Sequence, residues 1–283
     1  MRRILIAAAI ALFAFFAISC ATEADPTGLK GVWKSSDDDY SYTFTFTADG
    51  HYASEVYYLE YLEYAEFGTF EADESYIYTD DYDYPFIWDG SNLVIDYYGN
   101  ELVFKRTSKT ARNNTSAGKL CGVWRGQAGV AGFTKGGTFA SMGFRTNIDD
   151  FHADNAVLNI GGTENDYLIL NSKLYIRDED DIFGSNYTVV FDRETSDGED
   201  QTSRDILTLN NPWHLTDMGE GTNHYIYNFS SSGSYTMEYY YEYDTDRSKS
   251  SGTYRYSGHT IELSDDGDLA YMIVDLRPFM FSI

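Results

Sequence analysis

The chain repeats one short module three times, and this repetition constrains its fold more than any other feature of the sequence. The copies open with Gly-Val-Trp at 31–33, Gly-Val-Trp at 122–124 and Asn-Pro-Trp at 211–213, so the third copy lacks the glycine. Repetition of this kind indicates tandem copies of one folding unit. It predicts three modules, which span residues 28–108, 118–196 and 208–283.

Turn and strand signals recur inside the modules in the same order. Modules one and three both contain Phe-x₃-Gly-x-Tyr, at 46–52 and 229–235, in which a strand, a glycine turn and a second strand form a hairpin signature. Gly-Thr-Phe at 68–70 and Gly-Thr-Tyr at 252–254 follow at similar distances. The middle module is the most degenerate, because its Gly-rich stretch from 126 to 143 contains no such hairpin. We therefore expect an all-β chain.

One segment, Glu55 to Phe67, fits a helix as well as a strand, since Leu59, Leu62 and Glu66 would share a helical face. The matching stretch of the third module decides between the two, because residues 237–243 alternate with a period of two. Both segments are therefore predicted to be strands.

Each module then consists of several short antiparallel strands. A single sheet of that size would expose an apolar face to water, so it must curl into a small barrel or pair into a sandwich. The connections at 109–117 and 197–205 are polar and lack an apolar period, which is typical of surface linkers.

The order of the motifs resembles the short lipocalin-like domains of bacterial lipoproteins. Gly-x-Trp comes first, then Phe-x₃-Gly-x-Tyr, Gly-Thr-Phe or Gly-Thr-Tyr, and Asn-Leu-Val-Ile at 92–95 before a final apolar strand. The resemblance covers modules one and three well and module two only at its ends. It implies three tandem small antiparallel β-barrels, each with a Trp that closes the barrel floor, and it brings no catalytic residue to this chain.

The first twenty residues have the layout of a bacterial secretory signal. Two arginines precede an unbroken apolar run from 4 to 18, which is shorter than the roughly 20 residues of a membrane-spanning helix. The run leads into Cys20 through a sequence that resembles a lipobox, although Ala17 stands where leucine is usual. The resemblance implies that 1–20 is a lipoprotein signal peptide and that Cys20 is lipidated. Ordinary cleavage after Ala21 is the alternative.

Composition excludes some partners and some kinds of site. The net charge of −25 argues against nucleic acid and anionic membrane surfaces, which would be repelled. Such acidity favours disorder, but 26 Tyr, 18 Phe and 4 Trp supply enough area for buried cores. If Cys20 carries lipid, Cys121 has no intrachain partner, so no disulfide framework or paired-cysteine zinc site is possible. Alternation from Trp124 directs Cys121 away from the core, with burial between modules as the alternative.

Aromatic residues are the candidates for both packing and binding. Trp33, Trp124 and Trp213 recur at one position of the module, which favours a core role over a ligand-stacking platform. The Tyr/Glu ladders at 57–64 and 238–243 would present rings and carboxylates to solvent on one strand face, a combination that suits sugars or cationic groups. We therefore predict ligand binding by Tyr57, Tyr61, Tyr239 and Tyr241. A solvated face stabilised by cross-strand aromatic pairs is the alternative.

No pattern indicates catalysis or a metal site. The acidic clusters at 37–39, 80–83, 178–181 and 265–268 lack EF-hand spacing and are expected to be solvated hairpin tips. The five histidines are not at a metal-binding spacing, and no Gly-x-Ser-x-Gly motif is present. We expect no metal, no cofactor and no enzymatic activity.

The sequence therefore predicts a non-catalytic binding or surface-interaction protein, attached to a membrane by its N-terminal lipid. Its place would be the bacterial cell envelope, at the outer membrane or cell surface, and its partner an unidentified small molecule or an envelope or host protein. A structural envelope lipoprotein without a small-molecule ligand is the second hypothesis, and a hydrolase with an unrecognised site is the third. A hidden apolar cavity favours the first, filled barrels the second, and a cleft that gathers His, Asp and Ser the third.

Overall fold

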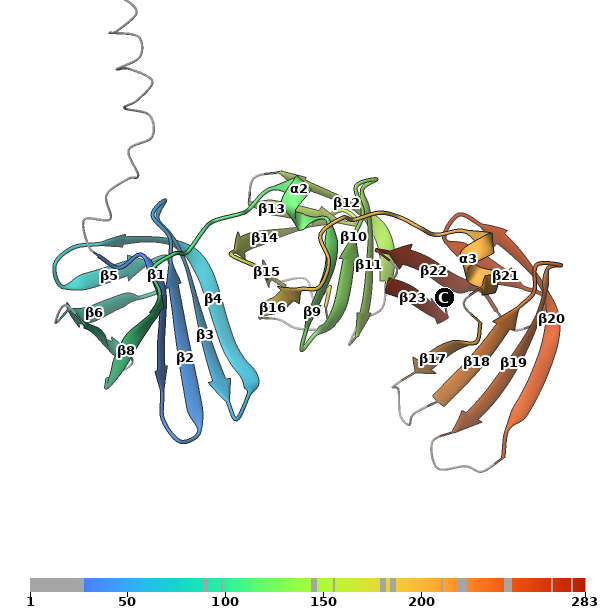
Figure 1. Ribbon diagram of the computed structural model, residues 1–283, viewed down its shortest axis with the longest axis horizontal. Coiled ribbons are helices and arrows are strands. Elements are labelled where there is room, and N and C mark those ends of the chain that lie inside the picture. Colours follow the sequence, from blue (N-terminus) through green and yellow to red (C-terminus); the bar gives the residue numbers. More distant parts are fainter. Residues whose placement is uncertain are drawn as a thin grey trace, which may run out of the picture. The chain divides into compact units, whose positions relative to one another are not determined.

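The structure is a computed structural model that describes residues 28–283, apart from 89–90, 98, 144–146, 155, 179–181, 184–186, 210, 218–222, 242–245, 266, 276 and 283. The expected signal peptide and Cys20 lie outside the described residues. Three antiparallel sheets follow one another along the chain, two of them closed barrels and the third a seven-stranded sheet (Figure 1). The predicted all-β fold of three tandem small antiparallel barrels is confirmed, with the third barrel nearly closed in the part of the chain that the structure describes.

Barrel 1 is closed, because each of its eight strands pairs with its sequence neighbours and the last strand pairs with the first. Closure leaves no free sheet edge. Its strands are β1 (Gly31–Ser36), β2 (Tyr40–Phe46), β3 (His51–Tyr58), β4 (Tyr61–Ala72), β5 (Tyr76–Thr79), β6 (Asp83–Trp88), β7 (Asn92–Tyr97) and β8 (Asn100–Ser108).

Barrel 2 has the same closed order and is preceded by the short helix α2 (Ala117–Leu120). The side chain of Ser116 caps this helix by accepting a hydrogen bond from the backbone amide of Lys119. The strands are β9 (Gly122–Gly126), β10 (Gly129–Phe133), β11 (Thr138–Gly143), β12 (Asn147–Asp154), β13 (Val157–Ile160), β14 (Thr163–Leu170), β15 (Lys173–Arg177) and β16 (Thr188–Arg193).

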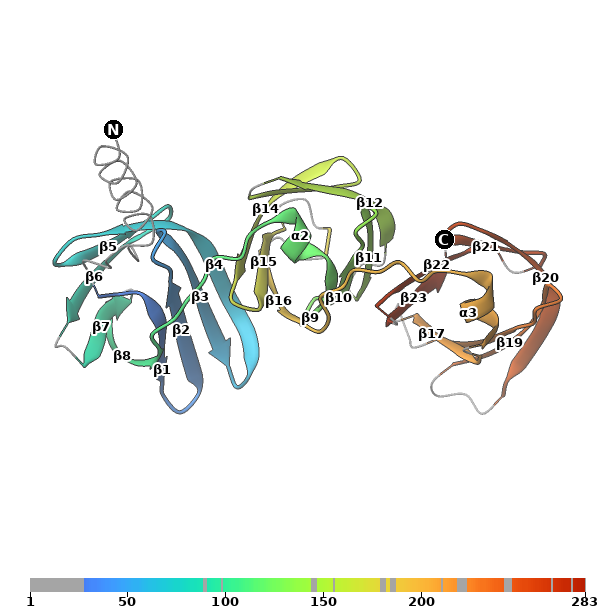
Figure 2. The same cartoon turned by 45° about the horizontal axis from the view of Figure 1, so that its top comes forward.

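Barrel 3 follows the helix α3 (Arg204–Leu209), and its first and last strands are not paired with each other in the described chain. Figure 2 shows α2 and α3 across one end of barrels 2 and 3. The strands are β17 (Trp213–Asp217), β18 (Asn223–Phe229), β19 (Ser234–Tyr241), β20 (Ser248–Ser257), β21 (Thr260–Leu263), β22 (Leu269–Val274) and β23 (Arg277–Ser282).

The segment that fits either a helix or a strand is a β-hairpin. Strands β3 and β4 pair along it, and Leu59 and Glu60 form its turn with φ values of 49° and 84°. Two consecutive positive φ values match a type I′ turn, whose twist suits the flanking strands. The strand prediction is confirmed, but the sequence did not indicate the turn, since neither residue is glycine or asparagine.

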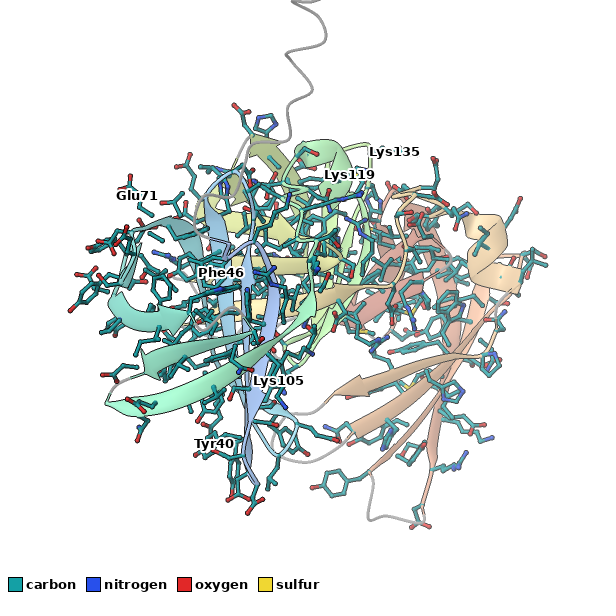
Figure 3. All side chains as sticks on the ribbon, turned by 60° about the vertical axis from the view of Figure 1, so that its left-hand side comes forward. Tyr40, Phe46, Glu71, Lys105, Lys119 and Lys135 are labelled. Atoms are coloured by element: carbon teal, nitrogen blue, oxygen red, sulfur yellow. The ribbon has the colours of Figure 1, made fainter. Side chains whose placement is uncertain are left out.

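Each barrel encloses a core of aromatic and aliphatic side chains, into which the repeated tryptophan is buried. Phe46, labelled in Figure 3, is one of the fully buried rings of barrel 1. The indole N–H of each tryptophan donates a hydrogen bond to the carbonyl of a preceding leucine. The pairs are Trp33 with Leu29, Trp124 with Leu120, and Trp213 with Leu207. The predicted core role of the three tryptophans is therefore confirmed.

The Gly-x-Trp opening has a geometric cause in the closed barrels. Gly31 and Gly122 have φ values of 137° and 126°, which L-residues with a side chain rarely adopt. A Cβ at Gly31 would also overlap the carbonyl oxygen of Ser108, and one at Gly122 that of Thr195, because the closing strand passes directly against the glycine. Asn211 stands two residues before Trp213, where the closed barrels have glycine. In the described part of barrel 3, β17 pairs only with β18, so no closing strand excludes a side chain at this position.

The closing strand of barrels 1 and 2 also carries an arginine onto the buried tryptophan. The guanidinium carbon of Arg106 lies 4.4 Å from the centroid of a Trp33 ring, and that of Arg193 lies 3.9 Å from a Trp124 ring. Arg106 donates to the carbonyl of Gly28, and Arg193 to that of Cys121. The cation–π contact and the hydrogen bonds together hold the end of the barrel closed.

Barrels 2 and 3 belong to one compact unit, because the chain divides into two units between Asn113 and Asn114. Their joint centres on Asp275 in the β22–β23 turn. Its carboxylate accepts hydrogen bonds from the Thr195 hydroxyl at 2.5 Å and from the amides of Gly198 and Glu199 at 2.9 and 2.8 Å. Burial alone would raise the pKa of Asp275, but these hydrogen bonds outweigh it and hold the pKa below its ordinary value.

Apolar packing reinforces this joint. Met272, Val274 and Phe279 of barrel 3 pack with Val123, Val130 and Ala140 of barrel 2 in one buried cluster. The connection between these barrels runs over the surface, as its polar sequence indicates, with Asp197, Glu199 and Asp200 exposed, but its amides are held by Asp275. Cys121 is buried against this connection, close to Gly198. A Cβ added to Gly198 would lie only 2.6 Å from the Cβ of Cys121. The alternative of burial between modules is thus correct for Cys121.

Candidate ligand-binding site inside barrel 1

Barrel 1 places a carboxylate on its interior face. Side chains alternate between the two faces of a strand, so Glu66 on β4 shares a face with Phe70, which packs against the barrel core. Glu66 is only 3% exposed. Its cross-strand partner on β3 is Ser54, which shares the interior face with Tyr52.

Two tyrosine hydroxyls donate hydrogen bonds to the Glu66 carboxylate. Tyr84 on β6 donates to Oε1 at 2.7 Å, and Tyr64 on β4 donates to Oε2 at 2.9 Å. Burial and the neighbouring Glu66 carboxylate raise the pKa of Tyr84, and the same two causes raise the pKa of Tyr97, which stacks on it. Tyr84 therefore stays protonated and remains a donor to Glu66 throughout the physiological pH range.

No cationic side chain neutralises Glu66 within the described residues. The ion pairs of the described chain do not include it, and its hydrogen-bond donors are the two tyrosine hydroxyls. By contrast, Glu194 is paired with both Arg125 and Arg277. A buried carboxylate without an opposite charge is unfavourable, so it attracts a cation or further hydrogen-bond donors.

Two further hydroxyl groups in the interior have no hydrogen-bond partner among the described residues, namely Ser54 Oγ and Tyr52 Oη. Ser54 is 1% exposed and Tyr52 is fully buried. A buried hydroxyl is normally paired, because leaving it unpaired costs about 1–3 kcal/mol. Strand register pairs Tyr52 with Gly68, two residues from Glu66 on the same strand face, and burial and the Glu66 carboxylate both raise the pKa of Tyr52. We call Ser54, Tyr52, Glu66, Tyr64 and Tyr84 the Glu66 cluster.

Aromatic rings connect the Glu66 cluster to residues that reach solvent. Tyr42, Tyr64 and Tyr97 are half-buried, whereas Tyr84 is buried. The ring centroids of Tyr42 and Tyr97 are 5.8 Å apart, and those of Tyr84 and Tyr97 are 5.9 Å apart. The carboxylate therefore lies at the inner end of a tyrosine-lined part of barrel 1.

Equivalent positions in the other barrels have different chemistry. Strand register aligns Trp33, Phe44, Ser54 and Glu66 of barrel 1 with Trp124, Ala131, Ser141 and Asn147 of barrel 2, and with Trp213, Tyr227, Met237 and Ser250 of barrel 3. At the position of Glu66, barrel 2 has Asn147 and barrel 3 has Ser250, so only barrel 1 has an ionisable side chain there. The barrels thus share a frame and differ in the interior groups that a ligand would meet.

The tyrosines predicted to bind ligand in module one lie next to the β3–β4 turn. Tyr57 is half-buried, and its hydroxyl donates to the carboxylate of Glu55 at 2.6 Å. Tyr61 begins β4 and is 71% exposed. Neither belongs to the Glu66 cluster, and their role in binding stays a prediction.

The two tyrosines predicted in module three lie near the end of β19. Tyr239 is half-buried, donates a hydrogen bond to Asn223 at 2.8 Å and packs with its ring centroid 5.1 Å from that of Tyr225. Tyr241 is also half-buried. Tyr239 shares the strand face of the buried Tyr235, so it faces the inside of the sheet. It is therefore not on the solvent-facing side of the ladder. Ligand binding by Tyr239 and Tyr241 stays a prediction.

Sequence reasoning did not single out Glu66 or Ser54. The sequence does contain a pattern that indicates the position of Glu66. In a strand, residues 66, 68 and 70 lie on the same face, so an inward-facing Phe70 predicts an inward-facing Glu66. The Tyr/Glu ladder at 57–64, which ends two residues before Glu66, indicates instead a strand face that presents rings and carboxylates to solvent. The pairing of Glu66 with Ser54 also depends on the Leu59–Glu60 turn, which sets the register of the hairpin.

The rest of the described chain does not gather groups for other chemistry. Among the described residues, no three His, Cys, Asp or Glu side chains lie close enough to hold a metal ion. His51 lies 3.4 Å from Asp49, and His259 lies 3.1 Å from Asp200. The described helices are too short to cross a membrane.

Comparisons with known proteins do not identify a family for the chain. No family model matches it, and no curated protein matches it. Structures of the Helicobacter pylori β clamp align over most of the chain at very low similarity. The clamp bound to a DNA ligase peptide is 7% identical with a TM-score of 0.18, covering 89% of this chain and 82% of the clamp. The clamp with 3,4-difluorobenzamide is 9% identical with a TM-score of 0.19 over the same shares. These values do not indicate a shared fold.

Proposed function

We propose that the chain is a lipid-anchored, extracytoplasmic binding protein that takes up a small molecule inside barrel 1. The observation that supports this most is the Glu66 cluster, in which a 3% exposed carboxylate lacks a cationic partner among the described residues. Two buried hydroxyls beside it also lack a partner in the described chain. A ligand that supplies donors to these groups would remove their desolvation penalty and so would be held firmly.

The same features argue against catalysis as the role of this site. Nucleophilic catalysis needs a nucleophile that is activated by an adjacent base or by a lowered pKa. The groups that contact Glu66 are the hydroxyls of Tyr64 and Tyr84, which donate hydrogen bonds to it. The raised pKa of Tyr84 keeps its hydroxyl a hydrogen-bond donor and not a nucleophile at neutral pH. Binding is therefore the activity that this arrangement supports best.

Native mass spectrometry of the full protein purified from its own host tests this proposal. We expect a retained small molecule on the wild type and its loss in Glu66→Gln, which keeps the size of the side chain and removes its charge. Glu71→Gln is the matched control, because Glu71 is on the same strand but exposed on the outside, as Figure 3 shows. If the wild type carries no adduct, or the adduct survives Glu66→Gln, the site is not in barrel 1 and the role as a structural envelope lipoprotein becomes the better hypothesis.

The lipid anchor is the second part of the proposal and is supported by the signal-like segment that ends at Cys20. A lipid chain contributes about 0.8 kcal/mol for each CH₂ group that it buries in the bilayer. We therefore expect Cys20→Ala to move the protein from the membrane fraction to the soluble fraction. Unchanged detergent partitioning of this variant, or a mature N-terminus at Thr22, would contradict the anchor.

A further inference from the structure

We propose that the ligand of barrel 1 carries a primary ammonium group, which sits between Glu66, Ser54 and Tyr52. This inference rests on the proposed binding function and names the chemical class that the Glu66 cluster recognises. It follows from the charge of the cluster, from its balance of donors and acceptors, and from its difference from the equivalent positions of barrels 2 and 3.

Charge is the first reason. Within the described residues, Glu66 brings a buried negative charge into barrel 1 without a paired Lys, Arg or His. A neutral ligand such as an alcohol or a sugar can donate hydrogen bonds to this carboxylate but leaves the charge uncompensated. A cation compensates the charge and gains a stronger, charge-assisted hydrogen bond.

The balance of donors and acceptors selects a primary ammonium among cations. Both carboxylate oxygens of Glu66 can accept more than the single tyrosine hydrogen bond that each receives, and Ser54 Oγ and Tyr52 Oη are unpaired acceptors in the described interior. A primary ammonium has three N–H donors, which matches these three groups. A quaternary ammonium would compensate the charge but would leave both hydroxyls without partners.

Aromatic rings around the carboxylate suit the same ligand. Tyr84, which donates to the carboxylate, has its ring centroid 5.7 Å from that of Phe44 and 5.9 Å from that of Tyr97, so its ring belongs to an aromatic cluster that begins at the carboxylate. Ring faces attract an ammonium group and the polarised CH₂ next to it. An aliphatic tail on the ammonium would contact these rings on the way to the half-buried Tyr97.

The other barrels provide a comparison within the same chain. At the positions of Ser54 and Glu66, barrel 3 has Met237 and Ser250, which offer no negative charge. The frame is otherwise shared, with a buried tryptophan and a stacked aromatic strand in both barrels. Recognition of an ammonium should therefore be restricted to barrel 1 and should be lost when its two residues are replaced by those of barrel 3.

Calorimetric titration of the full chain with three small probes tests the inference. The probes are n-butylammonium, its neutral counterpart n-butanol, and tetramethylammonium. We expect n-butylammonium to bind most tightly. Glu66→Gln should weaken it by about ten- to a hundredfold, since a hydrogen bond to a charged group is worth about 1.5–3 kcal/mol. Ser54→Ala should weaken it by about two- to tenfold, because it removes a neutral acceptor.

Two controls keep a failure of folding separate from a failure of recognition. Glu71→Gln removes a charge from the same strand outside the barrel and should leave n-butylammonium binding unchanged. The double variant Ser54→Met with Glu66→Ser copies barrel 3 into barrel 1 and should lose n-butylammonium binding. The near-ultraviolet circular dichroism of each variant must match that of the wild type for its titration to be compared.

The outcomes separate this inference from the proposed function. If n-butanol or tetramethylammonium binds as tightly as n-butylammonium and binding is lost in Glu66→Gln, barrel 1 is a binding site but does not select a primary ammonium. If n-butylammonium binds and Glu66→Gln has no effect, the ammonium is bound elsewhere and the inference is wrong. If n-butylammonium does not bind the wild type, the inference is overturned, whereas an adduct retained on the native protein would still support the binding function.

Discussion

Replacing Gly31 by alanine should destabilise barrel 1 more than the loss of a flexible residue explains. Gly31 has a φ of 137°, and a Cβ there would overlap the carbonyl oxygen of Ser108 at the end of β8. The substitution therefore strains the backbone of β1 and pushes β8 away from it. The hydrogen bonds and the Arg106–Trp33 contact that close the barrel depend on β8 staying in this place.

The magnitude follows from two contributions. A positive φ costs an L-residue with a side chain about 1–2 kcal/mol. The overlap with a backbone atom that cannot rotate away adds about 1–3 kcal/mol, the range for overpacking a well-packed site. The expected loss for Gly31→Ala is therefore about 2–5 kcal/mol, a large fraction of the about 5–15 kcal/mol that stabilises a typical domain.

Gly99→Ala is the matched control in the same barrel. Gly99 has a φ of 83°, but a Cβ there would meet no atom within 4 Å. It should cost only the backbone contribution of about 1–2 kcal/mol. Any gain from a stiffer unfolded chain is shared by both variants and cancels in the comparison.

Urea unfolding of the full chain, followed by hydrogen exchange of peptides from each barrel, measures both variants. We expect the midpoint for barrel 1 peptides to fall further in Gly31→Ala than in Gly99→Ala, while peptides of barrels 2 and 3 keep their midpoints. Equal losses for the two variants would refute the explanation of the Gly-x-Trp motif by the closing strand.

Three further predictions concern other parts of the fold. Trp33→Ala should destabilise barrel 1 by about 3–5 kcal/mol in the same urea assay, the range for removing a large buried aromatic, and a loss below about 1 kcal/mol would reject its core role. The pKa of Asp275 is lower in the folded chain than its ordinary value, so its contribution to the stability of barrels 2 and 3 is present above about pH 4 and is lost as the pH falls further. Asp275→Asn should lower their midpoint at pH 7 and flatten its decline toward pH 3, and an unchanged decline would contradict the role of the joint. Limited digestion with a non-specific protease should cut residues 109–112 before residues 197–203, because the amides of the second linker are bonded to Asp275. First cuts within 197–203 would contradict the joint at Asp275.

The sequence predicted the repeated frame because the frame depends on local signals. The tryptophan that begins each module, the glycine turns of the hairpins and the alternation of 237–243 each act over a few residues. Gly31 was visible as a motif, but its cause was not, since the Ser108 carbonyl that excludes a side chain comes from the far end of the module. The contact of Arg106 with Trp33 was not predicted for the same reason, because the two residues lie at opposite ends of the module.

The candidate site was missed because it depends on register and on inward direction. Glu66 comes directly after a Tyr/Glu ladder that indicates solvent, and only its pairing with Ser54 and the hydrogen bond from Tyr84 show that it belongs to an interior cluster. Asp275 is a similar case, because three amides and one hydroxyl from the 195–199 segment reach it across the barrel joint. In neither case does the sequence around the carboxylate show the donors that reach it, because those donors come from other strands or from the linker.

A crystal structure of the protein as purified from its own host would test the Glu66 site most directly. We predict electron density for a small molecule inside barrel 1, with a nitrogen within hydrogen-bonding distance of the Glu66 carboxylate and of Ser54 Oγ. An interior filled by protein side chains around Glu66, with Ser54 and Tyr52 bonded to other residues of the chain, would contradict the proposed binding site.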